Sequence, residues 1–176
     1  MIQTQVEFVP IRHLIIAATL LLSATASPAL AQQHPSASID VAAGWVGFAD
    51  DGIVSEAMFG GAARWYVSPR ISVGPEVIYI AGDNHSHFVV TGNVTLDLLA
   101  PNSSGPRAVT PFVVAGGGLF QTSESFASET FRSSEGAFTA GGGVRIAAGD
   151  HATFGIDARI GWETHLRVNA LVGIRF

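Results

Sequence analysis

Beyond residue 32, apolar and polar residues alternate along the chain with a period of two. The last segment shows the pattern most clearly, with apolar residues of one parity at Leu166, Val168, Ala170, Val172, Ile174 and Phe176. Arg, Asn and Gly occupy most of the positions between them, and residues 154–163 repeat the arrangement. Alternation over this length is typical of β-strands, because a helix would spread the same residues around its whole circumference.

The same period predicts further strands before these two. They lie at about residues 38–48, 54–67, 70–82, 86–99, 108–121 and 135–148. The two faces are least distinct in the first strand and around Gly116–Gly118. Turn-forming residues separate the runs at one set of ends, at Ser68-Pro69, Pro101–Pro106 and Gly149-Asp150, and Thr122–Ser134 is the longest break at the other. We therefore expect one all-β domain of about eight antiparallel strands.

The first 31 residues have the layout of a secretory signal peptide. A basic pair at Arg12-His13 precedes an apolar run, Leu14–Leu22, and an Ala-x-Ala site. The apolar run is shorter than the roughly 20 residues of a spanning helix. We place cleavage after Ala31, which leaves Gln32 first in a domain of residues 32–176; Ala24–Ala26 is an alternative site.

Composition narrows the class of protein. Only 13 % of the 176 residues are charged, against about 25 % in an ordinary soluble domain. The chain has no Cys, which excludes disulfides and thiolate metal sites, and an exported chain without Cys is typical of a bacterial envelope. All nine basic residues are Arg, and they are scattered within a net charge of −5, which argues against nucleic-acid binding.

The character of the two strand faces favours a membrane barrel over a soluble one. One face carries large apolar residues, while the other mixes Arg, Asn, Thr and Gly without the lysines that protect soluble sheet edges. A transmembrane barrel places the apolar face in lipid and the polar face in its lumen. Aromatic residues near the predicted strand ends fit interfacial girdles, with Trp65, Phe112, Phe154 and Phe176 at one side and Trp45, Tyr79, Phe88, Phe120, Phe138 and Trp162 at the other. A soluble lipocalin-like carrier is the alternative.

The strand positions predicted to face the lumen include charged residues of both signs. They are Arg64, Glu76, Asp97, Arg145, Asp157, Arg159, Glu163 and Arg167, with Arg175 near the rim. Since an unpaired buried charge is costly, we expect ion pairs, with Arg64 opposite or diagonal to Glu76 and Arg167 near Glu163. Eight strands enclose a space that side chains can fill. We therefore expect a salt-bridged plug, with a charge-lined conduit as the alternative.

The chain resembles the small eight-stranded outer-membrane barrels, a group that includes the OmpA transmembrane domain and OmpX, and more closely the outer membrane protein beta-barrel domain family. The resemblance rests on the signal peptide, the Pro111–Gly118 strand opening and the end Val172–Phe176. It implies periplasmic termini, Phe176 as a signal to the barrel assembly machinery, and Thr122–Ser134 as the longest surface loop. It also implies a monomer in contact with outer-membrane lipid, including lipopolysaccharide.

His85-Ser86-His87 is the one local cluster with catalytic or metal-ligating residue types. The serine points to the face opposite each histidine, and no third metal ligand is evident in the sequence. The glycine triplets at 116–118 and 141–143 are not phosphate loops and instead fit a strongly curved sheet. We expect no catalytic residue, cofactor or metal, and a structural or surface-interaction role in the envelope. A small-solute pore is the main alternative, and a lipid-modifying enzyme a distant one.

Overall fold

The computed structural model describes residues 35–48, 54–82, 85–99, 108–126, 129–161 and 165–176. The contacts within the chain group Gln33–Phe176 into one unit, separate from Met1–Gln32. The expected cleavage site at Ala31 and Gln32, the turn Pro101–Pro106, and Trp162 and Glu163 lie outside the described residues. The described residues include no helix long and apolar enough to cross a bilayer, a finding that does not bear on crossing by strands.

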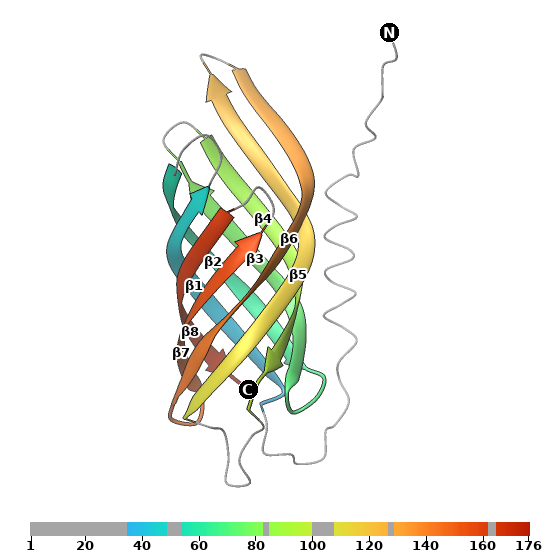
Figure 1. Ribbon diagram of the computed structural model, residues 1–176, viewed down its shortest axis with the longest axis vertical. Helices are drawn as coiled ribbons and strands as arrows, with labels where there is room; N and C mark the ends of the chain where they lie inside the picture. Colours follow the sequence, from blue (N-terminus) through green and yellow to red (C-terminus); the bar gives the residue numbers. More distant parts are fainter. Residues whose placement is uncertain (1–34, 49–53, 83–84, 100–107, 127–128, 162–164) are drawn as a thin grey trace. The chain divides into compact units, whose positions relative to one another are not determined.

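Eight antiparallel strands form a closed barrel in which each strand pairs with its neighbours in sequence (Figure 1). The strands are β1 (Ala37–Phe48), β2 (Val54–Tyr66), β3 (Ile71–Ala81), β4 (His85–Asp97), β5 (Val109–Phe126), β6 (Glu129–Ala148), β7 (Ala152–Gly161) and β8 (His165–Arg175). The predicted fold class, an eight-stranded up-and-down barrel, is confirmed. We call the end at which β1 begins and β8 finishes the terminal end, and the opposite end the hairpin end.

Pairing between the first and last strands closes the sheet. It extends from Ser38 opposite Arg175 to Phe48 opposite His165. Closure removes the two free edges that an open sheet would present, so the backbone groups of β1 and β8 are paired on both sides. A sheet without edges is the β-structure that can lie in hydrocarbon, where unpaired backbone groups cost several kcal/mol each.

The period of two assigns the faces as predicted. Along β8, Leu166, Val168, Val172 and Ile174 are exposed on the outside, while Arg167, Asn169, Gly173 and Arg175 are buried. β7 behaves in the same way, and Thr91, Asn93, Thr95 and Asp97 of β4 are buried between exposed or half-buried apolar residues. Along these strands the outward face is therefore apolar and the inward face polar, the reverse of a soluble barrel.

Two aromatic residues assigned to the girdles lie inside the barrel. Phe112 and Phe120 are each 4 % exposed, because their positions on β5 have inward parity. The prediction from closeness to a strand end was wrong for both, since parity decides which face a residue occupies. Phe59 was missed, and its ring packs outside against Tyr79 with centroids 5.2 Å apart.

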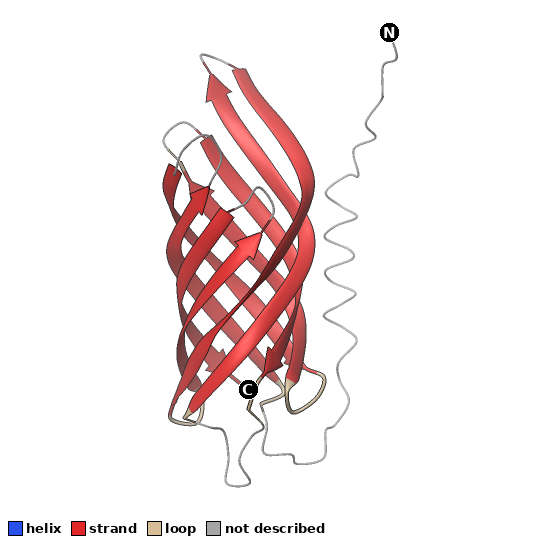
Figure 2. Ribbon diagram, in the orientation of Figure 1, coloured by secondary structure: helices blue, strands red, loops and turns tan. Residues whose placement is uncertain are grey.

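The stretch Thr122–Ser134 is not a loop. β5 and β6 continue through most of it in a paired hairpin, from Gln121 opposite Ser134 to Phe126 opposite Glu129. Figure 2 shows this hairpin rising above the other three at the hairpin end. The described residues Ser133, Ser134, Glu135 and Gly136 are all exposed, so neither face here requires apolar side chains. At these described positions alternation is absent for that reason, although the backbone pairing persists.

Glycine occurs where one strand passes close to its neighbour. A Cβ at Gly116 would meet the Asn93 side chain and, at 2.6 Å, the backbone oxygen of Gly92 on β4. At the next residue, Gly117, the nearest atom to such a Cβ is 3.6 Å away, an ordinary contact. The inward face of a tightly curved sheet is thus the crowded one, in keeping with the curvature role expected of the triplets.

We expect Gly116→Ala to lower the free energy of unfolding by about 1–3 kcal/mol, because the added methyl must displace Asn93 and the β4 backbone. Gly117→Ala is the matched control and is expected to change it by less than about 0.5 kcal/mol. Urea unfolding of the two variants in detergent, followed by tryptophan fluorescence, measures both. Equal effects would show that curvature does not depend on the inward glycine.

Candidate functional site

The interior of the barrel gathers the charged residues assigned to it by parity. Those that the structure describes are Arg64, Glu76, Asp97, Arg145, Asp157, Arg159 and Arg167, and all except the half-buried Arg64 are buried. Two further carboxylates, Asp40 on β1 and Glu56 on β2, are buried beside them. Both have inward parity, but Asp40 lies in the strand whose faces were least distinct in sequence.

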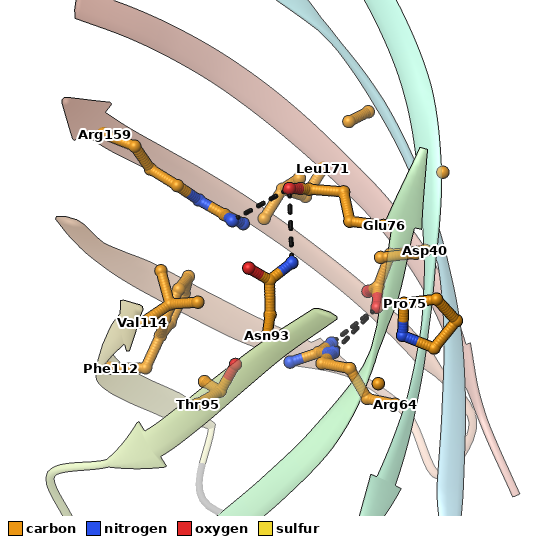
Figure 3. A pocket seen from close by; sticks show the side chains of 14 residues that line it. Asp40, Arg64, Pro75, Glu76, Asn93, Thr95, Phe112, Val114, Arg159 and Leu171 are labelled. Atoms are coloured by element: carbon orange, nitrogen blue, oxygen red, sulfur yellow. Dashed lines mark hydrogen bonds and ion pairs between the residues drawn. The ribbon is translucent and has the colours of Figure 1, made fainter. Parts of the chain in front are cut away.

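Glu76 on β3 lies at the centre of the network. Its Oε2 accepts hydrogen bonds from Arg159 at 3.1 Å and the Asn93 amide at 3.3 Å (Figure 3). The same oxygen accepts a third hydrogen bond from Arg167 at 2.6 Å. The two arginines are on β7 and β8, across the barrel from β3. This carboxylate therefore joins opposite walls of the barrel, and three donors offset the loss of its hydration.

Asp157 on β7 belongs to the same network, because it binds Arg159. Its Oδ2 accepts from Nε of Arg159 at 2.8 Å and lies 2.7 Å from Nη2 of that residue. The other carboxylate oxygen accepts from the Asn169 amide at 2.6 Å. Arg159 thus contacts two carboxylates through its planar guanidinium, a geometry that Lys cannot reproduce.

Two more ion pairs lie nearer the terminal end. Arg64 donates to Asp40 on the neighbouring strand, from Nη2 at 2.6 Å and from Nε at 3.0 Å. Arg145 on β6 pairs with Asp97 at 2.5 Å and donates to the Tyr66 hydroxyl at 3.0 Å. Its guanidinium also lies 4.4 Å from the centre of the Phe112 ring.

The ion-pair partner of Arg64 differs from the one expected from the sequence. Ala62 is opposite Glu76, which makes Arg64 diagonal to Glu76 on the adjacent strand. Arg64 nevertheless binds Asp40, because Asp40 is opposite Ala62 on the other side of β2 and is equally close in register. The expected contact between Arg167 and Glu163 lies outside the described residues.

The residues at the chain's end lie at the rim. Arg175 donates to the carbonyl oxygen of Gly149 at 3.0 Å. Phe176 is exposed beyond β8, and its carbonyl oxygen accepts from the backbone of Ser36 at 2.7 Å. The terminal aromatic is thus fixed beside the first strand.

An apolar layer fills the lumen on the hairpin side of the charge network. It consists of Val46, Met58, Ile78, Ile80 and Phe120, each no more than 4 % exposed. Cavities of about 30 Å³, beside Glu76, and about 20 Å³, beside Ile78, lie within the barrel. Each has room for one or two water molecules. The described side chains thus pack across the interior.

A second polar group occupies the hairpin end of the lumen. Glu56 of β2 is buried, with one carboxylate oxygen 2.5 Å from Nε2 of His85 and the other 3.9 Å from Nε2 of His87. These three residues bring their ligand-type atoms within 4.8 Å of one another. The two histidines were expected from the sequence as a cluster, whereas Glu56 was not. The available signal was that Glu56 shares the parity of Met58 and Arg64 on β2.

The family model for the outer membrane protein beta-barrel domain matches residues 16–172. The chain belongs to this family. Membership explains the apolar outer surface, which in an outer-membrane barrel contacts lipid, and it supports a location in the bacterial outer membrane. Comparison with curated protein sequences gives no match.

Solved structures of outer-membrane barrels share the fold. Neisserial surface protein A superimposes with a TM-score of 0.65 at 12 % identity, over 80 % of this chain and 96 % of that one. The N-terminal barrel domain of OprF from Pseudomonas aeruginosa superimposes with a TM-score of 0.57 at 13 % identity, over 79 % of this chain and 97 % of that domain. Ail, the attachment invasion locus protein of Yersinia pestis, superimposes with a TM-score of 0.54 at 12 % identity, over 81 % of this chain and 98 % of that one. At these identities the likeness concerns the fold alone.

In this outer membrane protein beta-barrel domain, we expect Glu76→Gln to lower the free energy of unfolding by about 3–5 kcal/mol, because Arg159 and Arg167 lose their shared carboxylate while buried. Asp150→Asn, at an exposed turn, is the control and is expected to change it by less than about 0.5 kcal/mol. Replacing Arg167 by Met should then cost less in the Glu76→Gln background than in the wild type. Additive effects in urea unfolding would contradict a shared network.

Proposed function

We propose that the protein is a non-enzymatic, monomeric outer-membrane barrel with a closed lumen and a structural or surface-interaction role in the envelope. The packed interior carries the proposal, since ion pairs tie β3 to β7 and β8 and an apolar layer fills the space beside them. A small-solute pore requires a continuous water-filled path. In an eight-stranded barrel, side chains of this size occupy that space.

The projecting hairpin favours surface interaction. β5 and β6 contain 18 and 20 residues, whereas the other strands contain 10 to 13. A paired hairpin presents a fixed backbone above the barrel, which a partner meets without first ordering a loop. Two of the structural neighbours are named as a surface protein and an attachment invasion locus protein, in keeping with such a role.

The proposed orientation places both termini in the periplasm and the long hairpin outside the cell. The proposal includes contact of the apolar surface with outer-membrane lipid, including lipopolysaccharide. It also assigns to Phe176 the role of an assembly signal read by the barrel assembly machinery. The exposure of the Phe176 ring beyond the last paired residue of β8 supports that assignment.

In planar bilayers, the purified wild-type barrel is expected to give no steady single-channel current, because the apolar layer and the ion pairs leave no wide aqueous path. Insertion is verified by heat-modifiable migration of the same sample, and a general porin run in parallel shows that the bilayers detect conduction. Steady unitary currents from the wild type would overturn the closed barrel and establish the pore.

Contact with lipid predicts a penalty for charge at the middle of the outer surface. Ile156, at the middle of β7, is 64 % exposed, so Ile156→Arg is tolerable in water but should cost about 2–4 kcal/mol in a bilayer. Ser134→Arg, at an equally outward position on the projecting hairpin, is expected to cost about 1 kcal/mol or less. Urea unfolding in phospholipid vesicles measures both variants, and equal small effects would contradict burial of β7 in lipid.

A further inference from the structure

The group at the hairpin end of the lumen is built by neighbouring strands. Glu56 is on β2, and His85 and His87 are two residues apart on β4, so both imidazoles point to the same face. Glu56 and His87 are buried, while the His85 side chain is 33 % exposed. The three ligand-type atoms converge where the lumen opens at the hairpin end.

Charge balance sets Glu56 apart from the other interior carboxylates. Among the described side chains, Asp40, Glu76, Asp97 and Asp157 each pair with an arginine, and the arginines are Arg64, Arg145, Arg159 and Arg167. Glu56 is a fifth buried carboxylate and contacts histidines instead. A buried carboxylate requires a positive partner, and at Glu56 that partner is either a protonated imidazole or a bound cation.

The carboxylate also has acceptor capacity to spare. Neither oxygen of Glu56 accepts a hydrogen bond from a described residue, although both are buried, and the close approach of His85 lacks hydrogen-bond alignment. Space beside them is kept by Gly82, since a Cβ there would lie 2.5 Å from Glu56 Oε1 and 2.6 Å from His85 Nε2. The carboxylate and an imidazole nitrogen thus adjoin a space kept free of any side chain from residue 82.

The ring of His87 is held with Nε2 toward Glu56. Its other nitrogen, Nδ1, is 3.0 Å from the Thr122 hydroxyl on β5. The rings of Phe120 and Phe48 pack against it at centroid distances of 4.9 and 5.4 Å. A hydrogen bond at the far nitrogen and packing around the ring are the outer contacts that orient a metal-binding histidine in proteins.

We propose that Glu56, His85 and His87 bind one first-row transition-metal dication such as Zn²⁺ at the hairpin-end mouth of the barrel. Two imidazoles and one carboxylate form a donor set that Zn²⁺ accepts, with a fourth position for water. Bonds of about 2.0–2.2 Å in tetrahedral geometry place ligand atoms about 3.3 Å apart. The ligand-type atoms here lie within 4.8 Å of one another, so binding requires side-chain rotations that bring them to that separation. The dication supplies a positive partner for the Glu56 carboxylate, which no arginine contacts among the described residues.

The test uses the full barrel purified without an affinity tag and stripped with a chelator. Titration with Zn²⁺ at pH 7.5, followed by calorimetry, is expected to give one site per chain, and Co²⁺ should give the visible absorption of a four-coordinate ion. Glu56→Gln and His87→Ala should each weaken binding at least 100-fold. His151→Ala, which removes a histidine beside Arg175 at the terminal end, should leave it unchanged.

Two milder variants separate metal binding from a structural role of the same residues. Thr122→Val keeps the shape of the wall but removes the hydroxyl contact at Nδ1 of His87, and it should weaken Zn²⁺ binding about 10- to 100-fold while the stripped barrel stays folded with a melting temperature only slightly lowered. Gly82→Ala should weaken it as well, by filling the space beside Glu56. Zn²⁺ should raise the melting temperature of the wild type but not of Glu56→Gln.

Absence of stoichiometric Zn²⁺ and Co²⁺ binding to the wild type would overturn the proposal. Equal affinity of the wild type and Glu56→Gln would do the same, because binding would then occur elsewhere on the barrel.

Discussion

Closure of a sheet of only eight strands is the constraint on which the rest of the structure depends. Pairing of β1 with β8 satisfies the backbone without water, but it leaves an interior too narrow for bulk solvent. Any charge inside must therefore have a partner of opposite charge or hydrogen-bonding groups within the barrel. Glu76, shared by Arg159 and Arg167, meets that requirement, and in doing so it fixes the distance between opposite walls.

The interior is layered along the barrel. Arg64–Asp40 and Arg145–Asp97 lie toward the terminal end, the Glu76 network lies beyond them, and the apolar residues around Ile78 lie on the hairpin side. Dispersion and ion pairing thus act at different depths, and together they fill the lumen. Glu56 and its histidines are the exception, since they face the mouth with donor atoms to spare.

Periodicity predicts well wherever two faces meet different surroundings. Strand number and the inward parity of Glu76 and Asp97 follow from alternation, because one face must be apolar and the other polar. Prediction fails where that contrast is lost, as in the projecting hairpin, where Ser133–Gly136 are exposed on both faces. It also fails for Phe120, whose apolar side chain lies inside among other apolar side chains.

The sequence by itself determined the barrel, its membrane-type inversion and most of its inward charges, because each follows from the two-residue period of a strand; Asp40 and Glu56 were not among them. Only the tertiary structure decided which charges meet. Arg159 and Arg167 reach Glu76 across 83 and 91 residues, and Arg64 binds Asp40 instead. The same folding brings Glu56 to the histidines of β4. Strand register and barrel closure set these contacts, and the alternation within a single strand predicts neither of them.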